Sequence, residues 1–139
     1  MRVFLDTNVL LDLLIPIRPS AMDSLVAVQT IRRCRYEFFV TTQSILDLNI
    51  TARRGHKSQE DIDVLIKWLL DFANVRHIDC FSLKVALESG HPDLEDSAQL
   101  ACAEEEECDL FLTTDKCILE RDVTPMMVMT PGQFIDRMR

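Results

Sequence analysis

Hydrophobic and polar positions divide the chain into two alternating kinds of segment. Apolar and β-branched runs are typical of buried strands, and they occupy residues 2–5, 36–40, 75–78, 109–113 and 126–129. Between these runs, apolar residues recur at helical spacing. The alternation predicts an α/β fold, a three-layer α/β/α sandwich around a central parallel sheet of about five strands. We see no repeat or linker, so we expect one domain over residues 1–139.

The helices are predicted from their capping residues and apolar faces. Ser20 and Ser58 are suitable N-caps, and Gly55 ends the helix that begins after the second strand. Further helices are expected over 81–88, from Pro92 and over 131–138. In the helix after Ser20, the residues expected to face inward are Met22, Leu25, Val26 and Val28.

Composition limits the class of protein. With 139 residues, of which 47% are hydrophobic, the chain is long enough to bury a core. No apolar run has the length of a membrane span, and Asp6 and Asp12 interrupt what would be the apolar region of a signal peptide. The five cysteines include no Cys-x-x-Cys pair, which favours free thiols in a reducing compartment. We therefore expect a soluble, cytoplasmic protein without a membrane partner.

The net charge of −8 argues against a surface that coats nucleic acid, because such surfaces are usually basic. It is compatible with a nuclease whose site is built from carboxylates. Such a site adds negative charge itself and needs metal ions to approach a phosphate group.

Carboxylates occur where strands end or where helices begin after them. These positions are Asp6, Asp47, the pair Asp93 and Asp96, and Asp115. In a parallel sheet such positions lie at one edge, where the side chains can converge. Converging carboxylates raise one another's pKa values, and divalent cations relieve that repulsion. Oxygen ligands suit Mg²⁺ or Mn²⁺, and such ions hydrolyse phosphodiesters by activating water and stabilising the leaving oxygen.

Each of these residues also has a simpler interpretation. Asp6 and Asp115 can be helix caps or turn residues, and Asp47 can be a solvated helix residue. Asp93 and Asp96 can be acids of a first helical turn. A basic cluster, Arg53, Arg54 and Lys57, is either a surface helix end or a contact for RNA phosphates. The chain has only three glycines and no glycine-rich phosphate loop.

Four motifs in order resemble those of the PIN-domain ribonucleases, including the VapC-type toxins of toxin–antitoxin pairs. They are FLDTNVLLD at 4–12, DLEDS at 93–97, CDLFLTTD at 108–115 and MTPGQF at 129–134. The resemblance covers essentially the whole chain. It departs from the family pattern at Asp47, where Glu is common, at Ser97 and at Ile118–Leu119. The shorter Asp47 side chain puts direct metal ligation at that position in doubt.

The resemblance implies a set of site residues. The Mg²⁺ or Mn²⁺ ligands would be Asp6, Asp47, Asp96 and Asp115, and the catalytic residues among them Asp6, Asp96 and Asp115. Asp93 would be an accessory acid. Asn8 and Thr114 would support the ligands by hydrogen bonding.

The resulting hypothesis is a metal-dependent endoribonuclease that acts on RNA as the toxin of a toxin–antitoxin pair. The resemblance implies a protein antitoxin as partner and a homodimer. The alternative is a PIN-like domain without catalysis that binds RNA or a partner protein. A phosphatase is a third possibility, but it needs a second acid two residues after its nucleophilic Asp, and Asn8 stands there.

Overall fold

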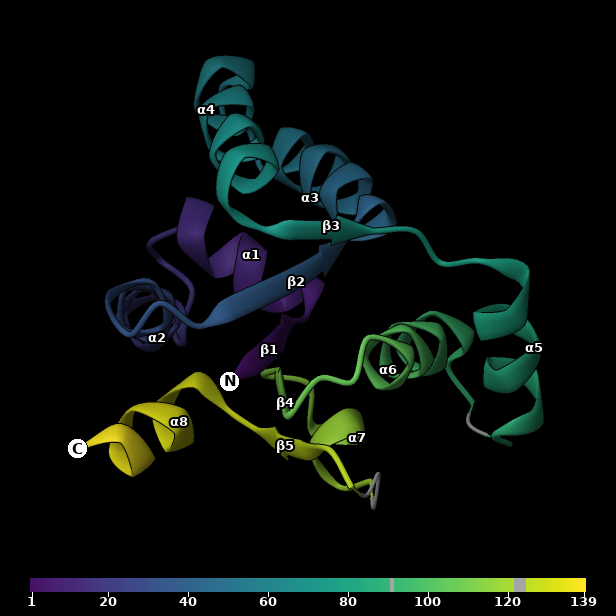
Figure 1. The fold of residues 1–139 in the computed structure, drawn as a ribbon. Helices are drawn as coiled ribbons and strands as arrows, with labels where there is room; N and C mark the ends of the chain where they lie inside the picture. The colour runs from purple at the N-terminus through teal and green to yellow at the C-terminus, as the bar shows by residue number, and fades with distance from the viewer. Residues whose placement is uncertain (91, 122–124) are drawn as a thin grey trace.

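The computed structural model describes residues 1–90, 92–121 and 125–139. In these residues the strands form one five-stranded sheet of order β3-β2-β1-β4-β5, in which every pairing is parallel (Figure 1). The strands are β1 (Arg2–Leu5), β2 (Glu37–Thr41), β3 (Asn74–Arg76), β4 (Leu110–Leu112) and β5 (Met127–Met129). The predicted parallel sheet is confirmed, although β3, β4 and β5 are shorter than the sequence indicated.

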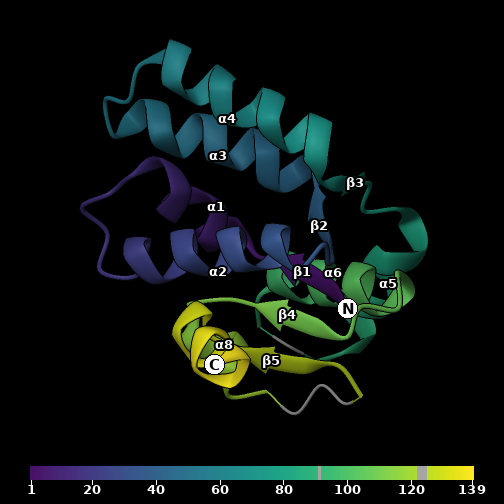
Figure 2. The same cartoon turned by 60° about the vertical axis from the view of Figure 1, so that its left-hand side comes forward.

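Helices cover both faces of the sheet, which confirms the predicted three-layer α/β/α fold (Figures 1 and 2). One layer contains α1 (Thr7–Leu14), α2 (Ala21–Arg33), α3 (Thr42–Arg54), α4 (Gln59–Phe72) and α8 (Pro131–Met138). On the other face lie α6 (Leu94–Glu105) and the short α7 (Lys116–Leu119), and α5 (Cys80–Glu88) packs against α6. No helix among the described residues is long and apolar enough to cross a membrane.

Successive strand residues supply the two cores, because side chains alternate between the faces of a sheet. Val3 and Leu5 of β1 pack with the α1 layer, whereas Phe4 packs with the α6 layer. There the Phe4 ring stacks on that of Phe111, with 5.1 Å between the ring centroids. The central strands are buried on both faces, as a parallel sheet requires.

The inward face of α2 differs in part from the prediction, of which the buried Val28 is confirmed. Met22 and Leu25 are 69% and 42% exposed, whereas Ala27 and Ile31 are buried. Ser24 on the inner face of the helix donates a hydrogen bond to Asp12, a buried carboxylate of α1. Apolar spacing alone does not reveal that polar contact.

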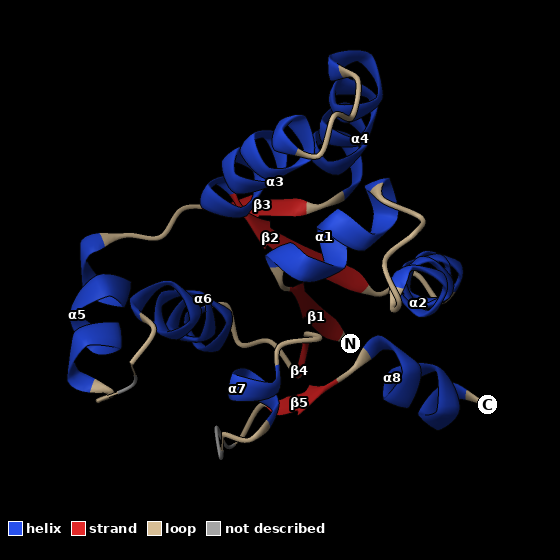
Figure 3. Cartoon of the chain, turned by 180° about the vertical axis from the view of Figure 1, so that it is seen from behind, coloured by secondary structure: helices blue, strands red, loops and turns tan. Residues whose placement is uncertain are grey.

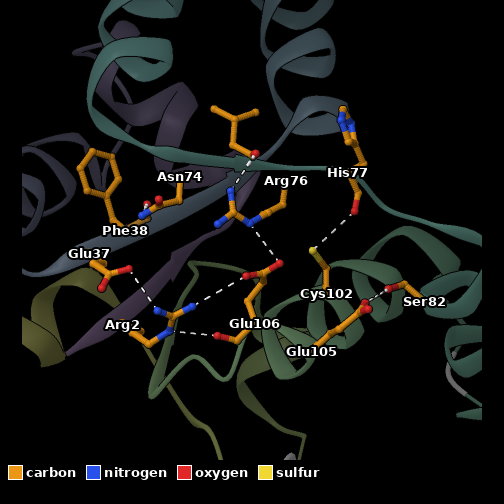
Figure 4. Close-up of polar contacts among 11 residues, drawn as sticks. Arg2, Glu37, Phe38, Asn74, Arg76, His77, Ser82, Cys102, Glu105 and Glu106 are labelled. Atoms are coloured by element: carbon orange, nitrogen blue, oxygen red, sulfur yellow. Dashed lines mark hydrogen bonds and ion pairs between the residues drawn. The ribbon is translucent and has the colours of Figure 1, made fainter.

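The carboxyl-terminal end of α6 is fastened to the sheet by charged residues (Figure 4). The Arg2 guanidinium contacts Glu37 at 3.1 Å and Glu106 at 3.7 Å, and Arg76 contacts Glu106 at 3.1 Å. Both arginines also lie over the Phe39 ring, 4.6 and 5.6 Å from its centroid. These contacts help to fix the position of α6, whose first turn carries the acidic residues considered next.

Candidate active site

Asp6 joins two neighbouring strands at the carboxyl edge of the sheet. Its Oδ1 accepts a hydrogen bond from the Thr7 backbone at 2.8 Å, and its Oδ2 accepts one from the Thr113 hydroxyl at 2.7 Å. The Asp6 backbone also donates to the Leu112 carbonyl at 3.0 Å. Asp6 is therefore both the N-cap of α1 and a carboxylate held against the end of β4.

A cleft of about 620 Å³ opens above this edge. Figure 3 shows the helices that form it, α1, α3 and α6, around the end of β1. Its polar lining includes Asp6, Asn8, Asp47, Glu95, Asp96 and Gln99, and its cations are Arg18 and Arg54. The cleft thus gathers four carboxyl groups from three helical segments.

Three of the predicted carboxylates affect one another electrostatically. Burial raises the pKa of Asp6 above its usual value, and the charge of Asp115 raises it further. The pKa of Asp96 rises to about 7, first through burial and then through the charges of Asp93, Asp115 and Asp6. Asp6 and Asp96 line the cleft, and Asp115 lies outside its lining but interacts with both, in a field that favours protons or cations.

Asp47 has a different neighbour. It lies in the second turn of α3, where Gln43 donates a 3.1 Å hydrogen bond to it. Across the cleft it faces Glu95, whose pKa rises to about 7 chiefly through a hydrogen bond with Asp47, and then through burial and the Asp47 charge. Asp47 and Glu95 therefore interact as a pair across the cleft.

Glu95 and Gln99 also line the cleft, and neither was predicted from the sequence. Glu95 stands beside Asp96 in a first helical turn, where acids are common, so it gave no distinct signal. Gln99 follows Asp96 by three residues and therefore shares its face of α6. It is buried, hydrogen-bonds to Asp6 and lies 3.5 Å from the Ser44 hydroxyl. The three-residue spacing from Asp96 is the sequence feature that could have indicated Gln99.

The accessory residues occupy distinct places. Asp93 caps α6 by accepting from the Asp96 backbone at 3.0 Å, and Asn8 lines the cleft. The hydroxyl on Asp6 belongs to Thr113, which also accepts from the Asp115 backbone at 3.0 Å. Thr114 is half-buried, and its supporting role stays a prediction.

The three basic residues predicted to contact RNA also lie in different places. Arg54 lines the cleft, at the end of α3 that is remote from Asp6. Arg53 and Lys57 line separate shallow depressions outside it. Of the three cations predicted to contact RNA, Arg54 is therefore the one that lines the acidic cleft.

The residues fit a divalent metal by their chemistry. They offer carboxylate oxygens, which suit Mg²⁺ or Mn²⁺, and their raised pKa values reflect a repulsion that a cation would remove. Within the described ranges, no group of three or more His, Cys, Asp or Glu residues is already arranged to hold a metal ion. The carboxylate oxygens of these residues lie near the same edge of the sheet, but among the described residues they do not form a complete coordination shell.

Comparison with known protein families shows which family the chain belongs to. The sequence matches the PIN domain family over residues 2–117. The chain belongs to the PIN domain family. The match includes Asp6, Asp47, Asp96 and Asp115, the four residues proposed as metal ligands. No curated protein matches the sequence at a significant level.

Solved structures with a similar fold include three toxin or toxin–antitoxin structures, each with a TM-score of 0.66 to this PIN-domain chain. A toxin–antitoxin complex from Klebsiella pneumoniae is 18% identical, and the match covers 93% of this chain and 97% of that one. VapC20 from Mycobacterium tuberculosis, a toxin that cleaves the sarcin-ricin loop, is 11% identical over 82% and 90% of the two chains. VapBC2 from Rickettsia felis, bound to a promoter DNA fragment, is 13% identical over 94% and 98%. At these identities the likeness establishes the shared fold.

Proposed function

We propose that this PIN-domain protein is a metal-dependent endoribonuclease and the toxin of a toxin–antitoxin pair. The observation that carries the proposal is the convergence of Asp6, Asp96 and Asp115 at the carboxyl edge of the sheet, where two of them have raised pKa values. Membership of the PIN domain family and the toxins among the solved structures support it.

The proposed metal is Mg²⁺ or Mn²⁺, held by Asp6, Asp96 and Asp115, with Asp47 in the fourth position. When bound, the metal supplies an activated water and stabilises the leaving oxygen of the phosphodiester. Asp6 is oriented for this role by Thr7 and Thr113, so it loses little conformational freedom on ligation. Asp47 is already hydrogen-bonded with Glu95 across the cleft. This contact makes Asp47 the least direct of the four ligands.

A direct test is cleavage of structured and single-stranded RNAs with Mg²⁺ or Mn²⁺ present and with a chelator added. The proposal predicts cleavage that depends on the metal and stops with the chelator. Wild-type protein that binds Mn²⁺ but leaves every RNA intact would contradict the catalytic part of the proposal.

A binding module without catalysis is the second candidate, and a specific observation favours it. The described residues contain no finished metal cluster, and Asp47 is engaged with Glu95. Calorimetric titration with Mn²⁺ separates the two candidates. Binding tighter than millimolar supports the nuclease, and the absence of any Mn²⁺ binding supports the module.

The proposed protein partner is an antitoxin, as in the Klebsiella pneumoniae complex. Apolar side chains remain exposed on α3 and α4, namely Leu46, Ile50, Val64 and Leu70. An antitoxin would cover such residues and place basic side chains at the acidic cleft. A small DNA-binding reading frame beside the gene would support this partner. We also propose a homodimer in the cytoplasm, for which the mass in solution is the test.

A further inference from the structure

Arg18 is a cation at the acidic cleft that the sequence analysis did not select. It lies in the loop between α1 and α2, and its side chain is 30% exposed. Its Nε donates a 2.6 Å hydrogen bond to Asp12, and its Nη2 lies 3.5 Å from the Asn8 side-chain oxygen. The guanidinium is therefore fixed beside the first turn of α1, which begins directly after Asp6.

The anchor of Arg18 is the carboxylate of Asp12, whose side chain is 0% exposed. Asp12 also accepts hydrogen bonds from the hydroxyls of Ser20, at 2.7 Å, and Ser24. A buried charge is stable only when it is paired and hydrogen-bonded, so this carboxylate holds Arg18 firmly in one place. Asp12 is thus the residue that positions the guanidinium.

Arg18 lines the cleft together with its carboxyl groups. An arginine has five N–H donors, and Asp12 and Asn8 engage two of them. Among the described residues, the ion pair of Arg18 is with Asp12 and not with a carboxylate of the cleft. Arg18 therefore keeps donors for a ligand in the cleft.

A polyanion that enters this cleft meets Asp6, Asp47, Glu95 and Asp96, which repel it. A cation at a fixed place near them is needed to hold and orient a phosphate group. The planar fork of arginine matches phosphate oxygens in pairs, and its prior immobilisation reduces the entropy lost on binding. Arg54 lines the same cleft from α3 but is exposed.

We propose that Arg18 binds a backbone phosphate of the RNA next to the cleaved bond, and that Asp12 positions it for that contact. This inference rests on the proposed function, because it assumes that RNA occupies the cleft. It assigns Arg18 to substrate binding and leaves the carboxylates as the groups at the reacting phosphate.

The first experiment measures KM and kcat on a short RNA for the wild type, Arg18→Gln, Arg18→Lys and the control Arg32→Gln. Arg32 lies over the Phe72 ring, outside the cleft, so the control removes the same charge elsewhere. We expect Arg18→Gln to raise KM by about tenfold, with a smaller change in kcat, and Arg18→Lys to lie between it and the wild type. In Arg18→Gln, the slope of log K for RNA binding against log salt concentration should decrease by the equivalent of about one phosphate contact.

The second experiment identifies the phosphate. RNAs that carry one neutral methylphosphonate at successive positions are bound to the wild type and to the Arg18 variants. At one position, the loss of binding caused by the methylphosphonate and the loss caused by the Arg18 substitution should not add, because each change removes the same contact. Additive losses at every position would overturn the proposal. If Arg18→Gln does not fold, Arg18→Lys carries the test, and wild-type KM with full additivity in a folded Arg18→Lys would overturn it.

Failure of this inference differs from failure of the proposed function. Wild-type cleavage with unchanged KM in folded Arg18 variants would reject the Arg18 contact alone. RNA binding without cleavage would reject catalysis, and dissociation constants would then replace KM in the same comparison. A wild type that neither binds nor cleaves RNA would reject both.

Discussion

The hydroxyl of Thr113 donates a 2.7 Å hydrogen bond to Asp6, and this contact joins the ends of β4 and β1. Both residues are buried, so water does not replace the bond easily when it is lost. The adjacent Thr114 is half-buried and offers a matched comparison one residue away.

Thr113→Val should lower the Mn²⁺ affinity and the RNA cleavage rate by about tenfold or more, because hydrogen bonds to ligands orient them. Thr113→Ser should restore most of both quantities, since it keeps the hydroxyl. Thr114→Val is the control and should have a smaller effect. If Thr114→Val proves as damaging as Thr113→Val, the effect is not specific to the hydrogen bond between Thr113 and Asp6.

Asp96 should make the metal-free protein less stable as the pH rises. Its pKa is raised from 3.8 to about 7, so between these values the folded protein binds more protons than the unfolded chain. The free energy of unfolding therefore falls with rising pH in that window. Asp96→Asn should be more stable than the wild type by about 1 kcal/mol at about pH 8, since solvent screens the half-buried Asp96, and should show no gain at about pH 4.

Denaturant unfolding in the presence of a chelator measures this difference. Added Mn²⁺ should shrink it, because the metal stabilises only the folded wild type. An equal difference at both pH values would show that the charge of Asp96 is not the cause.

The four proposed ligands should not be equally important. Asp6→Asn should weaken Mn²⁺ binding by about a hundredfold, whereas Asp47→Asn should weaken it by no more than about tenfold, since Asp47 pairs with Glu95. Calorimetry on each variant gives the dissociation constants. Equal losses in the two variants would place Asp47 in direct contact with the metal.

The cysteines should fall into two classes of reactivity. Cys102 and Cys108 are buried, and burial raises their pKa values to about 11 and about 12, which leaves little thiolate at neutral pH. Cys34, Cys80 and Cys117 are exposed free thiols. Titration with a chromogenic disulfide should show three fast thiols in the folded protein and five after unfolding. Five fast thiols in the folded state would contradict this assignment.

Local sequence patterns predicted the fold because strand runs and helical periodicity are properties of neighbouring residues. The alternation of strands and helices indicated the parallel sheet, and the strand ends indicated Asp6 and Asp115. The convergence of Asp96 with them follows from the same topology.

The remaining features depend on contacts between elements that are distant in sequence. On the inner face of α2, Ser24 contacts the buried Asp12, and the support of Asp6 comes from Thr113 across the sheet. Glu95 lines the cleft and contacts Asp47 on another helix. Such side-chain pairings leave no periodic signal in the sequence.

The central claim is tested most directly by RNA cleavage with Mn²⁺ in the wild type, Asp96→Asn and the control Glu104→Gln. Glu104 is exposed at the far end of α6, so the control neutralises a carboxylate of the same helix outside the cleft. We predict cleavage by the wild type and by Glu104→Gln, and loss of cleavage in Asp96→Asn with an unchanged fold by circular dichroism. Wild-type cleavage by a folded Asp96→Asn would contradict the account.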